Sequence, residues 1–270
     1  MRSQPLGDLR PIGIFDSGIG GLTVLRALRA RLPRERFVYL GDTARLPYGT
    51  KSPETVARYA LRASRFLAGH DIKLLVVACN TASATALPAL EAALPVPVIG
   101  VVVPGAHAAV RLTRGRVGVI GTESTIGSGA YHRALHGLRP DLEIVAAPCP
   151  LFVPLAEEGW FDHPVTRDVA AIYLAPLAAA GIDTLILGCT HYPLLRAAIA
   201  AGVGADVALV DSATAVADEV AHRLDAHGAR ADGGGSLSVL VTDAAARVRR
   251  IAALILEQRD TVLELVDLPD

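Results

Sequence analysis

Two cysteines stand at the same point of two similar stretches of this sequence. Cys79 follows the apolar run 74–78, Cys189 follows the run 185–188, and each is followed within two residues by a threonine. Short runs of leucine and β-branched residues are typical of strands buried on both faces. A cysteine at the carboxyl end of such a strand, just before a helix, lies where open α/β sheets bind their ligands. These two thiols are therefore the first candidates for chemistry.

A thiolate can act as a nucleophile, a metal ligand or a base. A nucleophile needs one nearby base, and His191 lies two residues beyond Cys189, but Cys79 has no histidine close in sequence. As metal ligands the cysteines have the wrong spacing, because neither C-x-x-C nor H-E-x-x-H occurs. His132 and His136 are four apart on a predicted helix, without an evident third ligand. We interpret them as an exposed helical face and expect no metal.

The third role, that of a base, makes use of two thiols at once. If they lie on opposite walls of one cleft, one removes a proton from a carbon and the other returns a proton to the opposite face. The result is inversion of a stereocentre. The amino end of the following helix favours thiolate, so we expect the thiol pKa to fall below its usual value of about 8.5.

Polar residues beside the two cysteines could hold an anionic substrate. They lie at junctions between a predicted strand and a predicted helix, where backbone N–H groups also bind carboxylates. The side-chain donors are Asp16-Ser17, Asn80-Thr81 and Thr190. These residues favour a substrate that carries carboxylates.

Strands and helices alternate along the chain. A predicted strand at 12–15 precedes a glycine-rich turn at 16–21 and a helix, and helices are predicted over 53–68, 81–94 and 165–180. A strand over 96–103 should be broken by Pro104-Gly105, with a helix over 106–112. One helix is expected from Gly121 to Leu138, and residues 155–160 form no clear element. Such alternation predicts parallel sheets with helical crossovers.

A weak internal repeat supports two copies of one unit. The strand-to-turn element at Asp16-Ser17 recurs at Gly121-Thr122, at nearly the same offset that separates the two cysteines. We therefore predict an α/β fold of two similar lobes, related by a pseudo-two-fold axis, each with a mainly parallel sheet flanked by helices. Residues 1–103 and 214–270 would form the lobe that carries Cys79, and residues 104–213 the lobe that carries Cys189. The active site would lie in the cleft between them.

Composition narrows the class of protein. The formal net charge of −1 and the aromatic content of 4% disfavour nucleic acid as a partner. No apolar stretch is long enough to cross a membrane and the N-terminus lacks an apolar signal core, so we expect a cytoplasmic protein without a membrane partner. Three cysteines in 270 residues do not suit a disulfide framework.

Each candidate also has an ordinary structural explanation. A single buried cysteine is more often inert core, and Cys149, which lies between two prolines, keeps that interpretation. The segment Asp16-Ser17-Gly18 could be only a turn, and it fails the G-x-G-x-x-G pattern because Thr23 replaces the third glycine. The pair Glu157-Glu158 could be solvated, and His191 could cap a helix. Because Cys79 and Cys189 stand at equivalent strand ends, we favour a functional role for both.

Several motifs, taken together and in order, resemble those of the glutamate racemases, which are cofactor-independent members of the aspartate/glutamate racemase superfamily. The resemblance extends from about Ile12 to Leu256. The motifs are IFDSGIGGL at 14–22, GD at 41–42 with PYG at 47–49, CNTA at 79–82 and GCTHYP at 188–193.

The resemblance implies an isomerase that interconverts L-glutamate and D-glutamate by two-thiol proton transfer, with no cofactor. It implies that Cys79 takes the α-proton of D-glutamate and Cys189 that of L-glutamate, with Asp16, Glu157 and His191 assisting the thiols. Glu158, beside Glu157, leaves the identity of the site acid open. The substrate-binding positions would be Asp16, Ser17, Tyr48, Gly49, Asn80, Thr81, Thr190 and His191, to which the repeat adds Thr122. The product would supply bacterial peptidoglycan synthesis.

The lysine content leads to the same expectation about cofactors. A pyridoxal phosphate enzyme needs a Schiff-base lysine, and the sequence has only Lys51 and Lys73. Lys73 lies at the start of a predicted strand, away from the predicted cleft. We therefore expect no cofactor, so that a carbanion must be stabilised electrostatically.

Other functions remain open at this level. A racemase of aspartate or another acidic amino acid would use the same thiols with a different side-chain pocket. A small-ligand binding protein on a two-lobed scaffold would leave both cysteines inert. The resemblance leaves the oligomeric state undecided, with a homodimer among the options.

Overall fold

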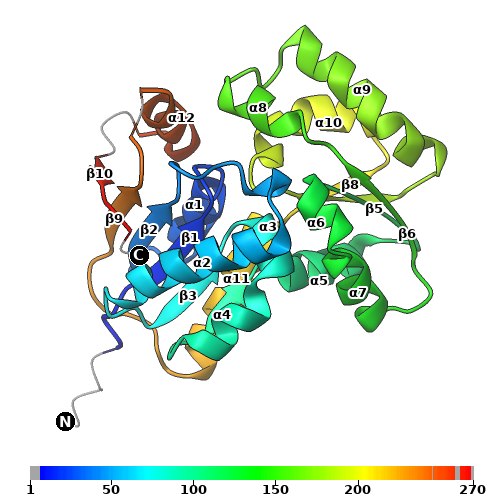
Figure 1. The fold of residues 1–270 in the computed structure, drawn as a ribbon. Helices are drawn as coiled ribbons and strands as arrows, with labels where there is room; N and C mark the ends of the chain where they lie inside the picture. Colours follow the sequence, from blue (N-terminus) through cyan, green and yellow to red (C-terminus); the bar gives the residue numbers. More distant parts are fainter. Residues whose placement is uncertain (1–6, 245, 259–261, 269–270) are drawn as a thin grey trace.

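The computed structural model describes residues 7–244, 246–258 and 262–268 and contains two parallel sheets. Helices cover both sheets, and Figure 1 shows the first sheet, with β1 to β3, beside the second, with β5, β6 and β8. No helix in the part of the chain that the structure describes is long and apolar enough to span a membrane. The predicted first lobe includes residues 1–6, 245, 259–261 and 269–270, which lie outside the described residues.

The first sheet has six strands in the order β10-β9-β2-β1-β3-β4, and the second has four in the order β6-β5-β7-β8. The strands of the first sheet are β1 (Ile12–Asp16), β2 (Arg36–Gly41), β3 (Leu74–Val77), β4 (Val98–Gly100), β9 (Ser236–Val241) and β10 (Leu263–Leu265). Those of the second are β5 (Arg116–Gly121), β6 (Glu143–Pro148), β7 (Thr184–Gly188) and β8 (Ala208–Asp211). All the pairings among these strands are parallel.

The repeat predicted from the sequence is present in the strand order. The series β2-β1-β3-β4 and β6-β5-β7-β8 have the same order, and Ile12 pairs with Leu74 as Val117 pairs with Thr184. Cys79 and Cys189 therefore follow corresponding strands, β3 and β7. The predicted fold class, two α/β lobes with parallel sheets, is confirmed.

Helices cover both faces of each sheet. The α-helices are α1 (Leu22–Arg31), α2 (Pro53–Ala68), α3 (Asn80–Thr85), α4 (Leu87–Ala93), α5 (Val102–Leu112), α6 (Glu123–Gly127), α7 (Ala130–Leu138), α8 (Phe152–Glu157), α9 (Pro164–Ala179), α10 (Arg196–Val203), α11 (Ser212–Ala226) and α12 (Ala246–Leu256). Two short 3₁₀ helices lie at Tyr48–Thr50 and Tyr192–Leu195.

Alternation along the strands divides the core. On β1, Ile12 and Ile14 face a cluster with α1, α11 and α12, whereas Phe15 faces the cluster with α2 and α4. On the second sheet Val117 and Val119 pack with α5 and α7, and Ile120 packs with α9 and α10. Since side chains of a strand point to opposite faces in turn, strands buried on both sides are apolar throughout. This explains the continuous apolar runs before the two cysteines.

The predicted strand over 96–103 was too long. The strand β4 ends at Gly100, and α5 begins at Val102 with Pro104 in its first turn. The sequence pattern treated Pro104-Gly105 as a break. Proline is compatible with the first turn of a helix because the N–H groups there have no intrahelical acceptor.

Two predicted helices are each divided in the structure. The segment 81–94 is split at Ala86, since a continuous helix would need a bond from the nitrogen of Pro88, which carries no hydrogen. The segment 121–138 is split at Gly129, whose φ of 66° lies in the left-handed region. Both splits follow from local chemistry that periodicity alone does not detect.

Two other elements were not predicted. Residues 152–157, within and before the segment without a clear pattern, form α8, and residues 263–265 form β10 at the edge of the first sheet. The strands β9 and β10 both belong to the first sheet. The chain thus returns to the first sheet after the second one is complete.

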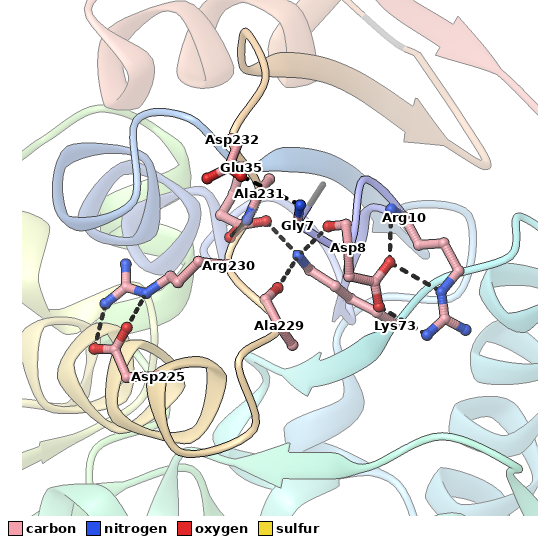
Figure 2. A network of polar contacts seen from close by, with 10 residues as sticks. All are labelled: Gly7, Asp8, Arg10, Glu35, Lys73, Asp225, Ala229, Arg230, Ala231 and Asp232. Atoms are coloured by element: carbon pink, nitrogen blue, oxygen red, sulfur yellow. Dashed lines mark hydrogen bonds and ion pairs between the residues drawn. The ribbon is translucent and has the colours of Figure 1, made fainter. Parts of the chain in front are cut away.

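A buried ion pair lies at the start of β3. It is at the amino ends of the strands of the first sheet, whereas the cysteines are at the carboxyl ends. Lys73 Nζ lies 2.7 Å from Glu35 Oε2, and both side chains are only 2% exposed. The same ammonium donates to the backbone oxygens of Asp8 and Ala229, while the Ala231 N–H donates to Glu35 Oε1. Figure 2 shows that this network joins the segment before β1 to the segment before β9.

Removing one partner of this pair should be costly. In Lys73→Met the Glu35 carboxylate stays buried without its cation, and we expect a loss of about 3–5 kcal/mol in the free energy of unfolding, measured with urea. The double variant Lys73→Met with Glu35→Leu should lose less than Lys73→Met alone. If the double variant were the less stable of the two, the pair would not be the origin of the loss.

Candidate active site

The carboxyl ends of β1, β3, β5 and β7 converge on one small cavity. Both Cys79 and Cys189 line it, together with a set of mainly polar residues. The other lining residues are Ser17, Gly18, Leu46, Pro47, Tyr48, Gly49, Asn80, Thr81, Thr122, Val153, Glu157, Thr190 and His191. Its volume of about 30 Å³ is roughly the share of one water molecule in the liquid, so the lobes are closed on each other.

Cys79 caps α3 and contacts Ser17. Its Sγ lies 3.4 Å from Ser17 Oγ, accepts the Ala82 N–H at 3.5 Å, and the residue is 5% exposed. The predicted position before a helix is therefore confirmed for this cysteine. Cys189 differs, because Thr190, His191 and a 3₁₀ turn precede α10.

The expectation of a lowered thiol pKa is wrong for Cys79. Burial, followed by the negative charge of Asp16, raises its pKa from 9.0 to about 12, against the opposing bonds from Ser17 and Ala82. That rise corresponds to roughly 4 kcal/mol. The end of a helix contributes only about 0.3–1 kcal/mol, so burial decides the outcome.

On the second lobe, Cys189 belongs to a short chain of polar groups. Its Sγ lies 3.8 Å from His191 Nδ1, and His191 Nε2 lies 3.4 Å from Glu157 Oε1. Burial alone would lower the pKa of His191, but the contacts with Cys189 and Glu157 outweigh it and raise the pKa to about 10. An imidazolium beside Sγ stabilises negative charge on that sulfur.

The structure distinguishes the two adjacent glutamates. Glu157 is 8% exposed and lines the cavity, whereas Glu158 is exposed and does not. Burial tends to raise the pKa of Glu157, but His191 and the charge of Arg247 lower it. Glu157 is therefore a carboxylate at neutral pH, held next to the imidazolium.

Asp16 lies behind the cavity and does not line it. The side chain is fully buried, its Oδ2 accepts the Gly18 N–H at 3.0 Å, and its Oδ1 has no hydrogen-bond partner among the described residues. Burial raises its pKa, partly offset by the charge of His191. Of the predicted site residues, only Asp16 is not part of the cavity wall.

Hydroxyl and amide groups connect the two sides of the cavity. Thr81 Oγ1 lies 3.0 Å from Thr122 Oγ1 and 3.2 Å from Thr125 Oγ1. Asn80 Oδ1 accepts a hydrogen bond of 2.9 Å from the Tyr131 hydroxyl, which leaves the Asn80 NH₂ group available as a donor. These bonds hold α3 of the first lobe against α6 and α7 of the second.

Sequence reasoning missed two residues that support this wall, Tyr131 and Asp42. Tyr131 lies on α7, 51 positions from its partner Asn80, and no local pattern links them. Asp42 accepts bonds from Tyr48 Oη at 2.6 Å and from Arg45 Nη1 at 2.7 Å. The sequence could have indicated Asp42, because the GD motif at 41–42 accompanies the PYG motif that contains Tyr48. Only Tyr48 and Gly49 were predicted to belong to the site.

Glycine in the turn after β1 is explained by close approach. A methyl group at Gly20 would lie 2.5 Å from His191 Nδ1 and would also meet the Thr190 hydroxyl. A methyl group at Gly49 would lie 2.5 Å from Thr122 Cβ. The backbone of the first lobe thus packs directly against residues of the second.

The variant Gly20→Ala should damage the site without unfolding the protein. The added methyl group must displace His191 from its contact with Cys189, and a shift of about 1 Å can cost about 100-fold in rate. Turnover of a substrate identified for this site should fall by that order. The control is Gly137→Ala on α7, where a methyl group meets nothing within 4 Å. Equal activity of the two variants would contradict this packing argument.

The two lysines and the histidine pair lie apart from the thiols. Lys73 is held by Glu35, and neither lysine lines the cavity. Among the residues that the structure describes, no group of three or more His, Cys, Asp or Glu could hold a metal ion. The expected independence from cofactors and metals stays a prediction. A larger hollow of about 520 Å³ between α4, α5 and α11 contains neither thiol.

Comparison with known families places this cavity in context. Residues 22–220 match the family of Asp/Glu/hydantoin racemases. The chain belongs to this racemase family.

Among its relatives, glutamate racemases are closely similar. The glutamate racemase of Geobacter metallireducens is 59% identical over 216 residues, which are 80% of each chain. The crystal structure of a Bacillus anthracis glutamate racemase isoform has a TM-score of 0.93 at 41% identity, covering 96% of this chain and 98% of that one. The Francisella tularensis glutamate racemase, solved in complex with D-glutamate, has a TM-score of 0.92 at 38% identity, covering 97% and 98%.

Proposed function

We propose that this chain racemises glutamate by moving the α-proton between Cys79 and Cys189. The single observation that carries the proposal is that both thiols, from corresponding strand ends of two similar lobes, line one cavity. The high identity to glutamate racemases supports glutamate as the substrate. The chain is thus an amino-acid racemase, an isomerase that interconverts L-glutamate and D-glutamate.

The reaction needs one thiolate and one thiol in each turnover. The thiolate takes the α-proton, so that a C–H bond breaks, an S–H bond forms and the electron pair stays on the α-carbon. The opposite thiol then gives its proton to the other face of the carbon. The two sulfurs exchange protonation states, and no oxidant or reductant is consumed.

The surroundings of the two thiols differ. At neutral pH Cys79 is a thiol, because its pKa is raised to about 12. His191, whose pKa is raised to about 10, has its Nδ1 3.8 Å from Cys189 Sγ. The family resemblance assigns removal of the α-proton of L-glutamate to Cys189 and that of D-glutamate to Cys79. Asp16 would assist Cys79, and Glu157 with His191 would assist Cys189.

The cavity wall offers donors for two carboxylates. The amide of Asn80, oriented by Tyr131, supplies N–H groups, and hydroxyls project from both lobes. Preorganised donors of this kind stabilise the negative charge that develops as the α-proton leaves. The proposed substrate-binding residues are Ser17, Tyr48, Gly49, Asn80, Thr81, Thr122, Thr190 and His191, whereas Asp16, which the resemblance also implied, does not line the cavity. The Thr81–Thr122 bond must open to admit the substrate, because the closed cavity is far smaller than glutamate.

The wider role follows from the product. D-glutamate is a building block of peptidoglycan, so the enzyme supplies bacterial cell-wall synthesis. The proposal includes a cytoplasmic location, which cell fractionation tests, and a homodimer, which sedimentation equilibrium of the purified protein tests.

We also propose lobes of residues 1–103 with 214–270, and of residues 104–213. The strands β9 and β10 belong to the first sheet, which supports the assignment of residues 214–270 to the first lobe. The core clusters support boundaries close to these, because Val101 and Ala213 pack with the first sheet, whereas Val102 and Val210 pack with the second.

The decisive test is racemisation with solvent exchange. Purified protein treated to remove bound cofactors should convert either pure enantiomer of glutamate to the racemate, and in deuterium oxide it should incorporate deuterium at the α-carbon. Cys79→Ser and Cys189→Ser should each lower kcat by at least about 1000-fold, since a serine hydroxyl is a far weaker acid than a thiol. Cys149→Ser serves as the control, because Cys149 does not line the cavity.

Other outcomes would replace the proposal. Optical rotation that stays constant with well-folded protein would exclude racemisation of glutamate. Turnover of aspartate in preference to glutamate would identify a different acidic amino acid as the substrate. Binding of glutamate that survives loss of both thiols, without any exchange, would indicate a binding protein.

A further inference from the structure

An arginine of the first lobe contacts the acid of the second. Arg247 lies on α12, which follows β9 of the first sheet, whereas Glu157 ends α8 beside the second sheet. Arg247 Nη2 lies 2.8 Å from Glu157 Oε2, and its Nε donates to the Glu157 backbone oxygen at 3.3 Å. The remaining nitrogen, Nη1, lies 3.3 Å from Glu158 Oε1. Figure 1 shows α12 and α8 on the same side of the molecule.

The two oxygens of the Glu157 carboxylate contact different partners. Glu157 Oε2 faces Arg247, and Glu157 Oε1 faces His191 Nε2 at 3.4 Å. Because the guanidinium is planar and holds both the carboxylate and the backbone oxygen of Glu157, it restricts rotation of that side chain. The same guanidinium also contacts the exposed side chain of Glu158. Arg247 thus contacts both glutamates, and only Glu157 also faces His191.

Burial separates this pair from an ordinary surface salt bridge. The Glu157 side chain is 11% exposed, whereas the Arg247 side chain is 45% exposed. Exposed pairs contribute little, but a mostly buried carboxylate needs its partners to remain in place. Separation of the lobes would withdraw Arg247 and leave Glu157 free to turn from His191.

We propose that Arg247 is a positioning residue that holds Glu157 against His191 and so makes the proton transfers of Cys189 depend on closure of the two lobes. The inference rests on the proposed racemase function. Arg247 does not line the cavity, so it acts on the substrate only through Glu157 and His191. Its effect must therefore fall on one thiol of the pair, Cys189, and leave Cys79 unchanged.

The variants Arg247→Met and Arg247→Lys test this role. In Arg247→Met the carboxylate loses its partner, and we expect kcat for glutamate to fall by about 10- to 100-fold, the range for a misplaced catalytic group. Arg247→Lys keeps the charge without the fork and should recover part of the loss. The matched control is Arg250→Met, an exposed arginine of the same helix, which should leave kcat within about twofold of the parent.

Isotope effects separate a role through Cys189 from general structural damage. If proton transfers at Cys189 become slower, removal of the α-proton by Cys189 limits the rate more strongly in one direction of the reaction. In the reverse direction Cys79 removes the α-proton, and that removal then limits the rate less. With α-deuterated substrates, the isotope effect on kcat/KM in Arg247→Met should rise for one enantiomer and fall for the other. Unchanged isotope effects, or a shift in the same direction for both enantiomers, would overturn the proposal.

A double-mutant cycle checks that the effect passes through Glu157. The double variant Glu157→Gln with Arg247→Met should be no slower than Glu157→Gln alone, because Arg247 then has no carboxylate to hold. Additive losses would overturn the proposal. If the parent protein fails to racemise glutamate, the proposed function is wrong. If the parent is active and Arg247→Met is equally active, the proposed function stands and the role of Arg247 is wrong.

Discussion

The proposed two-base reaction needs an acid–base group on each face of one carbon. One parallel sheet cannot easily meet this demand, because the groups at its carboxyl edge lie side by side. Two sheets with the same strand order, whose carboxyl edges share a cavity, place Cys79 and Cys189 at corresponding points on two lobes. In the proposed reaction, the internal repeat is therefore the basis of the chemistry. The helices, the glycine turn and the polar wall all serve to bring these two edges together.

Burial dominates the electrostatics of this arrangement. A thiol at the start of a helix is expected to ionise more easily, yet Cys79 is so enclosed that desolvation and the charge of Asp16 outweigh the helix end. His191 experiences the same burial but has Glu157 and Cys189 as partners, and its pKa rises to about 10. Two similar lobes thus give their thiols different surroundings. The proposed transfer needs one protonated and one ionised sulfur in each turnover.

Several of the contacts between the lobes around the cavity are polar. The Thr81–Thr122 hydroxyl pair, the Tyr131–Asn80 bond and the contact of Arg247 with Glu157 each join one lobe to the other around the cavity. Polar contacts of this sort exchange readily with water, so they permit the opening that a substrate larger than the cavity demands. In the proposed reaction, closure then rebuilds the donor wall and the chain of groups behind Cys189. Substrate enclosure and the alignment of the proposed acid–base residues are linked in this way.

The sequence by itself determined the two lobes, the parallel sheets and most of the cavity wall, because apolar runs, turn residues and the motifs around Cys79 and Cys189 are local signals. It did not reveal the helix that starts at Val102, since the proline there is tolerated only in the first turn. Only the tertiary structure decided that Glu157 rather than Glu158 faces His191, that Asp16 lies behind the wall, and that Tyr131 and Arg247 support the site. Each of these depends on contacts between residues far apart in the chain, and on burial, which no window of neighbouring residues records.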